Sequence, residues 1–152
     1  MTFYRLGSLT RRNPAQAFSG EGALYAAGRW NSAGTRLVYT STSVALACLE
    51  TLVHIRALQR PEERWLFTID IPDELVETLR PVPVGWHTEP AGVASQAAGD
   101  KWIATQRGVA LLVPSVIVPM EQNALINPRH PQFRLDWVKA PVRFRYDPRL
   151  RE

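Results

Sequence analysis

Short apolar runs separated by turn residues dominate the chain, and their spacing predicts strands more often than helices. The predicted strands cover residues 2–7, 35–41, 64–72, 109–119, 123–133 and 142–147. Pro114 divides the fourth of these runs, and Asn127 before Pro128 is a turn former that leads the fifth run into a loop. The pattern therefore predicts about six strands.

The most apolar run has the length and composition of a helix. It covers residues 44–59, follows a Ser/Thr cluster at 41–43 and is stopped by Pro61. Any hydroxyl of that cluster can cap the helix by accepting from the free backbone N–H groups of its first turn. A second, short helix is predicted at 100–106.

Two segments lack a strong periodicity. Residues 7–27 are mixed and polar, with Asn13-Pro14 as a turn signal, and residues 73–100 are punctuated by Pro and Gly. We expect the second segment to form a long surface excursion. Because strands and helices do not alternate regularly, the prediction is an α+β fold with a mostly antiparallel sheet and few helices, in a single domain spanning 1–152.

A thin line of polar residues runs along the helix predicted at 44–59. At 100° per residue, Ser43, Glu50 and His54 fall within about 40° of one another. The opposite side is apolar and consists of Leu46, Leu49, Leu52 and Val53. A surface helix has a broad polar face, so this pattern predicts a helix that is buried on most sides and turns one strip toward a cleft.

Two interpretations of this line differ in what they predict for Glu50. In one, Glu50 and His54 form a solvent-exposed i,i+4 pair worth about 0.3 kcal/mol. In the other, the carboxylate converges with Arg29, Tyr39 and Ser41 near the junction between strand 35–41 and the helix. The second interpretation brings a cation, an aromatic ring, a hydroxyl and a carboxylate together, and we take it as the hypothesis.

Composition and charge indicate the core residues and the cellular compartment of the protein but do not indicate its function. The formal net charge is +4, and Arg143 and Arg145 alternate with apolar residues, as on the outer face of a strand. Cys48 is expected to be buried and structural, and Trp30 and Trp102 to anchor the core. A single cysteine, no signal-like N-terminus and no apolar run of membrane-spanning length favour a cytoplasmic protein.

Several common types of active site are not supported by the sequence. His54, His87 and His130 are far apart and lack the spacing of metal ligands, so no metal is expected. Neither a Gly-rich phosphate loop nor a nucleophile elbow occurs. A single carboxylate with arginines and aromatic rings suits cleavage of NAD, whose nicotinamide is an already activated leaving group. Arginines suit the diphosphate, a carboxylate suits the cationic ribose, and an aromatic ring can stack on nicotinamide.

Several blocks of the chain resemble the RES domain family, in the same order, from Tyr4 to about Leu150. They are "YRLG", "GRWNSAGTRLVYTSTSVALACLETLVH", "GDKWI", "ALLVPSVIVPMEQNALINPRHPQF" and "FRYDPRL". RES proteins are toxins of Xre–RES toxin–antitoxin systems with an ADP-ribosyltransferase-like fold. Members deplete NAD by hydrolysis or phosphorolysis, and some transfer ADP-ribose to a protein. The resemblance therefore implies this fold for the chain and NAD as its substrate.

The resemblance also implies roles for individual residues. The Arg, Glu and Ser that name the family fall on Arg29, Glu50 and Ser115, which are the predicted catalytic residues. Arg5 and Arg29 would hold the diphosphate, Tyr39 would stack on nicotinamide, and Ser115 would bond to NAD or support the carboxylate. The remaining predicted NAD-binding residues are Ser41, His54 and Asn123.

The main hypothesis is therefore a toxin that cleaves the nicotinamide–ribose bond of NAD, as a glycohydrolase or a phosphorylase. Two alternatives stay open: mono-ADP-ribosyl transfer to a macromolecule, and a non-catalytic basic module that binds nucleic acid. The resemblance also implies a Xre-type antitoxin that covers the site by inserting a C-terminal segment near the arginines. It leaves a homodimer within that complex open.

Overall fold

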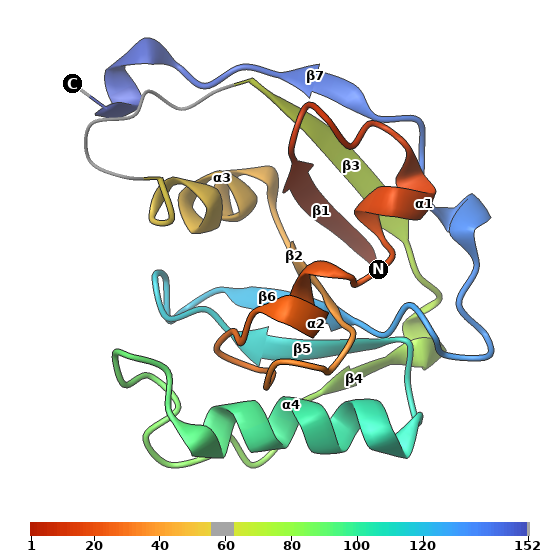
Figure 1. The fold of residues 1–152 in the computed structure, drawn as a ribbon, viewed down its shortest axis with the longest axis vertical. Coiled ribbons are helices and arrows are strands. Elements are labelled where there is room, and N and C mark those ends of the chain that lie inside the picture. Colours follow the sequence, from red (N-terminus) through yellow and green to blue (C-terminus); the bar gives the residue numbers. More distant parts are fainter. Residues whose placement is uncertain (56–62, 152) are drawn as a thin grey trace.

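A single mixed sheet organises the fold of the computed structural model, which describes residues 1–55 and 63–151 (Figure 1). Its seven strands lie in the order β4-β5-β6-β2-β1-β3-β7, and among neighbouring strands only β4 and β5 run parallel. The strands are β1 (Thr2–Gly7), β2 (Val38–Ser41), β3 (Arg64–Asp70), β4 (Val76–Thr78), β5 (Ala110–Pro114), β6 (Gln122–Ile126) and β7 (Val142–Phe144). The predicted α+β, mostly antiparallel fold is confirmed.

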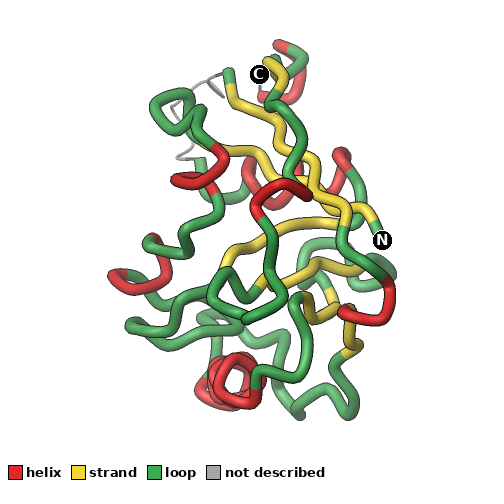
Figure 2. Tube along the Cα trace, turned by 90° about the vertical axis from the view of Figure 1, so that its right-hand side faces the viewer, coloured by secondary structure: helices red, strands yellow, loops and turns green. Residues whose placement is uncertain are grey.

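The helices lie around this sheet and differ greatly in length. Helix α3 (Val44–Leu52) follows β2, and α4 (Val93–Thr105) runs along the β4 side of the sheet (Figure 1). After a 90° turn α4 is seen end-on beneath the strands (Figure 2). The short elements are α1 (Pro14–Ala17), α2 (Gly22–Tyr25), and the 3₁₀ turns η1 (Asp73–Leu75), η2 (Leu135–Trp137) and η3 (Pro148–Arg151).

Helix α3 departs from its prediction in length and in burial. Ser43 is its N-cap, because the Ser43 hydroxyl accepts from the Leu46 N–H at 3.0 Å, but the helix ends at Leu52 rather than near 59. Residues 56–62 of the predicted helix lie outside the described residues. Leu46 and Leu52 are buried as expected, whereas Leu49 and Val53 are 40% and 54% exposed, so the expected burial of that side holds for only two of its four residues.

The segment 73–100 is only partly the surface excursion that its Pro and Gly content predicted, because residues 79–92 have neither helix nor strand whereas the two ends of the segment are regular. It contains η1, β4 and the first half of α4, which begins well before the helix predicted at 100–106. Gly99 allows this helix to pack closely against the loop at Trp30, because a Cβ at position 99 would collide with the Trp30 carbonyl oxygen. The remaining strand predictions are confirmed with shorter ends, and residues 115–119 form a turn rather than a strand.

The core is divided between the two faces of the sheet and the space beneath α3. Phe3, Phe67 and Phe18 belong to the cluster on the face covered by α1. Trp30 and Trp102 belong to the cluster under α4, which confirms that they anchor the core. The third cluster packs α3 against β1 and consists of Leu6, Ala47, Cys48, Leu52 and Tyr146. Cys48 is buried there, as expected.

The sheet is joined weakly at its centre. Strands β1 and β2 share one register pair, Tyr4 with Ser41, whereas β1 and β3 share six and β2 and β6 share four. The sheet therefore consists of two half-sheets, β4-β5-β6-β2 and β1-β3-β7, that meet along one line. In Figure 1 they lie at different angles, with α3 beside the line where they meet.

Candidate active site

A hydrogen-bonded network holds the Glu50 carboxylate at the end of the β2–β6 strand pair. Glu50 Oε1 accepts from the Ser115 hydroxyl at 2.8 Å and from the Asn123 side-chain amide. Ser41 completes the network by donating its hydroxyl to Asn123 Oδ1 at 2.7 Å. The structure thus brings together four of the predicted site residues, which come from α3, β2, β6 and the turn after β5.

The local fold explains why these side chains meet. Asn123 and Ser41 are register partners of β6 and β2, so their side chains lie on the same face of the sheet. Ser115 is fully buried directly after Pro114, and its hydroxyl accepts from the backbone N–H groups of Ile117 and Val118 at 3.1 and 3.0 Å. Because both of these N–H groups point at the Ser115 oxygen, its proton is directed toward Glu50.

One carboxylate oxygen of Glu50 remains open. Oε2 accepts no hydrogen bond from any residue within 1–55 or 63–151, and the Glu50 side chain is only partly buried. The carboxylate is therefore fixed through Oε1, and Oε2 has no hydrogen-bond partner among the described residues. This arrangement suits a group that must face positive charge or ribose hydroxyls without changing its position.

Tyr39 connects the network to the preceding loop. Its hydroxyl donates to Asn31 Oδ1 at 2.7 Å and accepts from the Trp30 N–H at 3.0 Å. Burial raises the pKa of Tyr39 to about 12, and the charges of both Arg29 and Glu50 also act on it. Tyr39 is therefore neutral at pH 7.

Arg29 is occupied by protein groups rather than free. Its Nη1 donates to the carbonyls of Trp86 and Thr88, both at 2.8 Å, and its Nη2 donates to the Glu89 carboxylate at 2.8 Å. The Arg29 side chain is 13% exposed and that of Glu89 is 82% exposed. Arg29 thus fastens residues 86–89 beside its own loop, and Trp30 stacks on Trp86 at 6.0 Å between ring centroids.

Arg5 has the opposite character. Its Nη1 donates to the Tyr39 carbonyl at 3.0 Å across the line between the half-sheets. Its Nε atom is buried and has no hydrogen-bond partner among the described residues. Burial, followed by the nearby charge of Arg11, lowers the pKa of Arg5 to about 10. Arg5 remains charged at pH 7, without a carboxylate partner in the described part of the chain.

His54 is not brought into the network. The wheel that aligned it with Glu50 assumed a helix continuing to about residue 59, but His54 lies in the exposed turn after Leu52. Within the described residues, the His54 side chain makes no hydrogen bond or ion pair with Glu50. Asn127, assigned a structural role, forms a turn by accepting from the Arg129 N–H at 3.0 Å.

Three contributors to this region were missed by sequence reasoning. Asn31 is buried to 1% exposure and holds the Tyr39 hydroxyl, Glu89 pairs with Arg29, and Arg11 acts on Arg5. The role of each residue depends on a contact between loop segments that show no periodic pattern of apolar residues in the sequence. The "GRWN" block was the one available signal, because Asn31 stands two residues after Arg29 in it.

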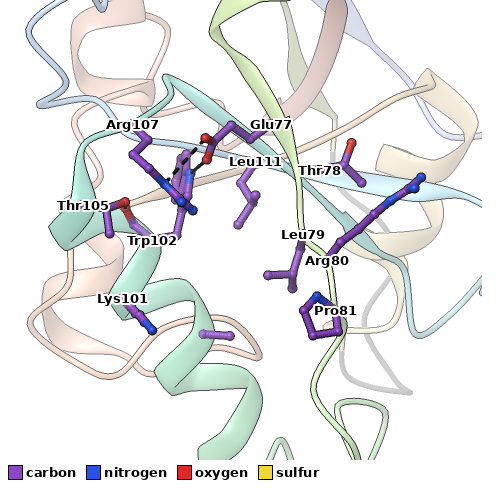
Figure 3. A pocket seen from close by; sticks show the side chains of 11 residues that line it. Glu77, Thr78, Leu79, Arg80, Pro81, Lys101, Trp102, Thr105, Arg107 and Leu111 are labelled. Atoms are coloured by element: carbon purple, nitrogen blue, oxygen red, sulfur yellow. Dashed lines mark hydrogen bonds and ion pairs between the residues drawn. The ribbon is translucent and has the colours of Figure 1, made fainter.

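A separate cavity of about 620 Å³ lies between α4 and the segment that follows β4 (Figure 3). Glu77 lies at its edge, where it accepts from the Trp102 indole N–H at 2.9 Å and pairs with Arg107 at 3.6 Å. Arg80 points away from Lys101 and Arg107 in Figure 3. None of the predicted site residues lines this cavity.

The sequence profile of the RES domain matches residues 2–147, which is nearly the whole chain. The chain belongs to the RES domain family. One relative of this RES domain is "Prs ADP-ribosylating toxin" of Sphingobium sp. (strain YBL2), 44% identical over 98% of this chain and 96% of the relative. "Toxin Res" of Yersinia enterocolitica is 41% identical over 99% of this chain and all of that protein.

A solved structure also has the fold of this RES domain. It is the M. tuberculosis MbcT–MbcA toxin–antitoxin complex, with a TM-score of 0.70, covering 98% of this chain and 85% of the matched chain. Sequence identity is 20%, so the likeness concerns the fold. Among the described residues no helix is both long and apolar enough to cross a membrane, and no three His, Cys, Asp or Glu side chains are grouped to hold a metal ion.

Proposed function

We propose that this RES domain cleaves the nicotinamide–ribose bond of NAD. The observation that carries the proposal is Glu50, which is fixed through one carboxylate oxygen by Ser115 and Asn123 while the other stays open. Loss of nicotinamide leaves positive charge on C1 and the ring oxygen of ribose. A fixed carboxylate stabilises this charge without reorganising, which is the main electrostatic contribution that an enzyme makes to such a step.

The other predicted residues divide the remaining work. Arg5 and Arg29 hold the diphosphate, since guanidinium groups match phosphate oxygens in geometry and charge. Tyr39 supplies an uncharged ring for nicotinamide, and its hydroxyl keeps the loop at 30–31 in place. Ser115, Asn123 and Ser41 position the carboxylate. In this assignment, His54 has no contact that supports a role.

The proposal includes a toxin neutralised by a Xre-type antitoxin. Two relatives that match nearly the whole chain are named toxins, and the matched structure is a toxin–antitoxin complex. An enzyme that consumes a central cofactor must be covered until it is needed, which is the task of such a partner. We place this single-domain toxin in the cytoplasm, with its partner over the arginine side of the site.

Transfer of ADP-ribose to a macromolecule is the second candidate. It is favoured by one observation, the ADP-ribosylating relative that is 44% identical to this chain. Both candidates break the same bond and differ only in the acceptor. A nucleic-acid module has less support, because Arg143 and Arg145 are each bonded to Glu63 at 2.6 Å and not free for phosphates.

The test incubates the purified chain, freed of any antitoxin, with NAD in the presence and absence of phosphate. Chromatography distinguishes the two reactions by their products. Attack by water gives nicotinamide and ADP-ribose, whereas attack by phosphate gives nicotinamide and a phosphorylated ADP-ribose. NAD labelled in its adenylate part reports transfer, because the label then moves to protein or nucleic acid. Unchanged NAD with water and phosphate, from a protein shown to be folded, would contradict the hydrolase and the phosphorylase, and no transfer of label to added protein or nucleic acid would contradict the second candidate.

A further inference from the structure

The surroundings of Arg5 do not satisfy its hydrogen-bond donors or balance its charge. Arg5 donates one hydrogen bond, to a neutral carbonyl, and its buried Nε has no partner in the described part of the chain. A buried guanidinium that lacks a carboxylate costs free energy that the fold must supply elsewhere. Such an unsatisfied buried donor requires an explanation, and an anionic ligand supplies one.

The loop after β1 returns to the same side of the sheet as Arg5. Arg5 and Phe67 are register partners, so their side chains share a face. Phe18, directly after α1, meets Phe67 edge-on with 6.0 Å between ring centroids. The segment between β1 and Phe18 therefore crosses over the face on which Arg5 lies, and Arg11 is in the middle of this segment.

Two contacts hold this segment in place. The Trp65 indole donates to the Leu9 carbonyl at 3.1 Å, and the Arg11 N–H donates to the Ser8 carbonyl at 3.0 Å. The Arg11 side chain is exposed and has no hydrogen bond or ion pair with the described residues. Its charge is nevertheless near enough to lower the pKa of Arg5. Arg11 thus lies in the segment that crosses the face of Arg5, and neither arginine has a carboxylate partner among the described residues.

We propose that Arg11 and Arg5 together form the binding site for the diphosphate group of a dinucleotide, with Arg11 as a binding residue that the RES resemblance does not assign. The inference rests on the proposed function for the identity of the ligand. Two guanidinium groups match the two negative charges of a diphosphate, and each can bind phosphate oxygens through two N–H groups. The bound anion removes the repulsion between the arginines and satisfies the buried donor of Arg5.

The neighbouring Arg12 provides a matched control. Its guanidinium lies over the Trp65 ring, 5.0 Å from the ring centroid, and Arg143 lies over the same ring at 4.8 Å. Arg12 is therefore engaged with an aromatic ring rather than with Arg5. Arg11→Gln and Arg12→Gln each remove one positive charge, at adjacent positions. A difference in ADP affinity between the two variants therefore does not come from the net charge of the protein.

The experiment titrates the full chain, freed of antitoxin, with ADP by calorimetry at low and moderate salt. ADP carries the diphosphate and undergoes no cleavage. Arg11→Gln should raise the Kd for ADP about tenfold, because a charge-assisted contact is lost. Arg12→Gln should change the Kd less than about twofold. Arg5→Gln should weaken ADP at least as much as Arg11→Gln, and thermal unfolding checks that this variant is folded.

The possible results test the anion site and the proposed cleavage of NAD independently. Equal effects of Arg11→Gln and Arg12→Gln, or no ADP binding by the unaltered chain, would overturn the inference. If inorganic phosphate bound as tightly as ADP with the same dependence on Arg11, the site would be one for free phosphate and the diphosphate assignment would be wrong. Arg11-dependent binding of ADP by a folded chain that leaves NAD intact would support the anion site while contradicting the proposed function.

Discussion

The two ends of the candidate site are built in opposite ways. Around Glu50, each hydroxyl and amide of the network has a partner, and the carboxylate is held by two side chains. Around Arg5, one donor is used, a buried donor is unpaired and a second arginine adds repulsion. Both regions are charged and partly buried, so burial alone does not explain the difference.

The difference reflects what each charge must do. A group that stabilises charge formed during a reaction has to be in position beforehand, so its own hydrogen bonds should be complete. A group that binds an anion gains affinity when its donors have no competing partner. Arg29 lies between these extremes, because Glu89 already occupies part of its guanidinium.

Glu50→Gln should reduce NAD cleavage about a thousandfold, because the fixed negative charge is lost from the site. The Gln carbonyl can still accept from Ser115 and Asn123, so the variant should remain folded. Chromatographic measurement of NAD consumption and a thermal unfolding curve test the two parts. Glu74→Gln, at an exposed position of η1, is the charge-matched control. Retained cleavage by a folded Glu50→Gln protein would remove Glu50 from its role.

Asn123→Asp should turn the complete network into a repulsive one. The new carboxylate faces Glu50 Oε1 in place of an N–H donor, which should cost about 3 kcal/mol of unfolding free energy at pH 8. Because two close carboxylates share a proton, the pKa of the pair rises in the folded state. The destabilisation should therefore be small below pH 4 and grow as the pH rises.

Urea unfolding of Asn123→Asp at several pH values measures this dependence. Asn13→Asp serves as control, since Asn13 caps α1 by accepting from the Ala15 N–H at 2.9 Å and an aspartate does the same. A loss of stability that is independent of pH would show that the Glu50 network does not depend on its single charge.

Tyr39→Phe should separate the ring of Tyr39 from its hydroxyl. The variant leaves buried Asn31 without its donor and the Trp30 N–H without its acceptor, which should cost about 2 kcal/mol of unfolding free energy. If the ring stacks on nicotinamide, cleavage should fall less than about threefold, whereas Tyr39→Ala should lose most of it. A stable Tyr39→Phe protein as inactive as Tyr39→Ala would place the hydroxyl in the reaction. Tyr25→Phe, at 86% exposure, is the control.

Glu89→Gln should move Arg29 toward the unpaired state of Arg5. The exposed ion pair contributes little to stability, so the unfolding free energy should change by less than about 0.5 kcal/mol. The KM for NAD should fall about threefold with kcat unchanged, because the diphosphate no longer competes with a carboxylate for the guanidinium. A higher KM would instead mean that Glu89 positions Arg29 for the substrate.

The sequence predicted the fold where pattern and pairing agree. Strands β1 and β3 have strong β-forming runs, and Ser43 stands where a helix cap was expected. Helix α4 was largely missed because its sequence contains Gly99 and Asp100 and lacks an apolar stripe. Contact with distant Trp30 holds it, which no local pattern shows.

The residues of the candidate site also divide into those that the sequence predicted and those that it did not. The wheel placed Glu50 on a polar strip, and the resemblance added Ser115, which lies 65 residues away and bonds to it. The wheel aligned His54 with Glu50 on a helix that in fact ends at Leu52, and the NAD-binding role of His54 stays a prediction. Arg11 and Glu89 lie in loops, whose positions depend on packing against other segments rather than on periodicity.

The single register pair between β1 and β2 makes the sheet mechanically soft along one line. Ser41 belongs both to that pair and, through its hydroxyl, to the Glu50 network. Ser41 and Asn123 belong to one half-sheet, whereas α3, which carries Glu50, packs against β1 of the other, so a force that opens the line acts on the position of the carboxylate relative to Asn123. Besides the register pair, the Arg5–Tyr39 hydrogen bond and the packing of α3 on Leu6 of β1 link the two half-sheets, so both ends of the candidate site share the line along which the sheet can bend.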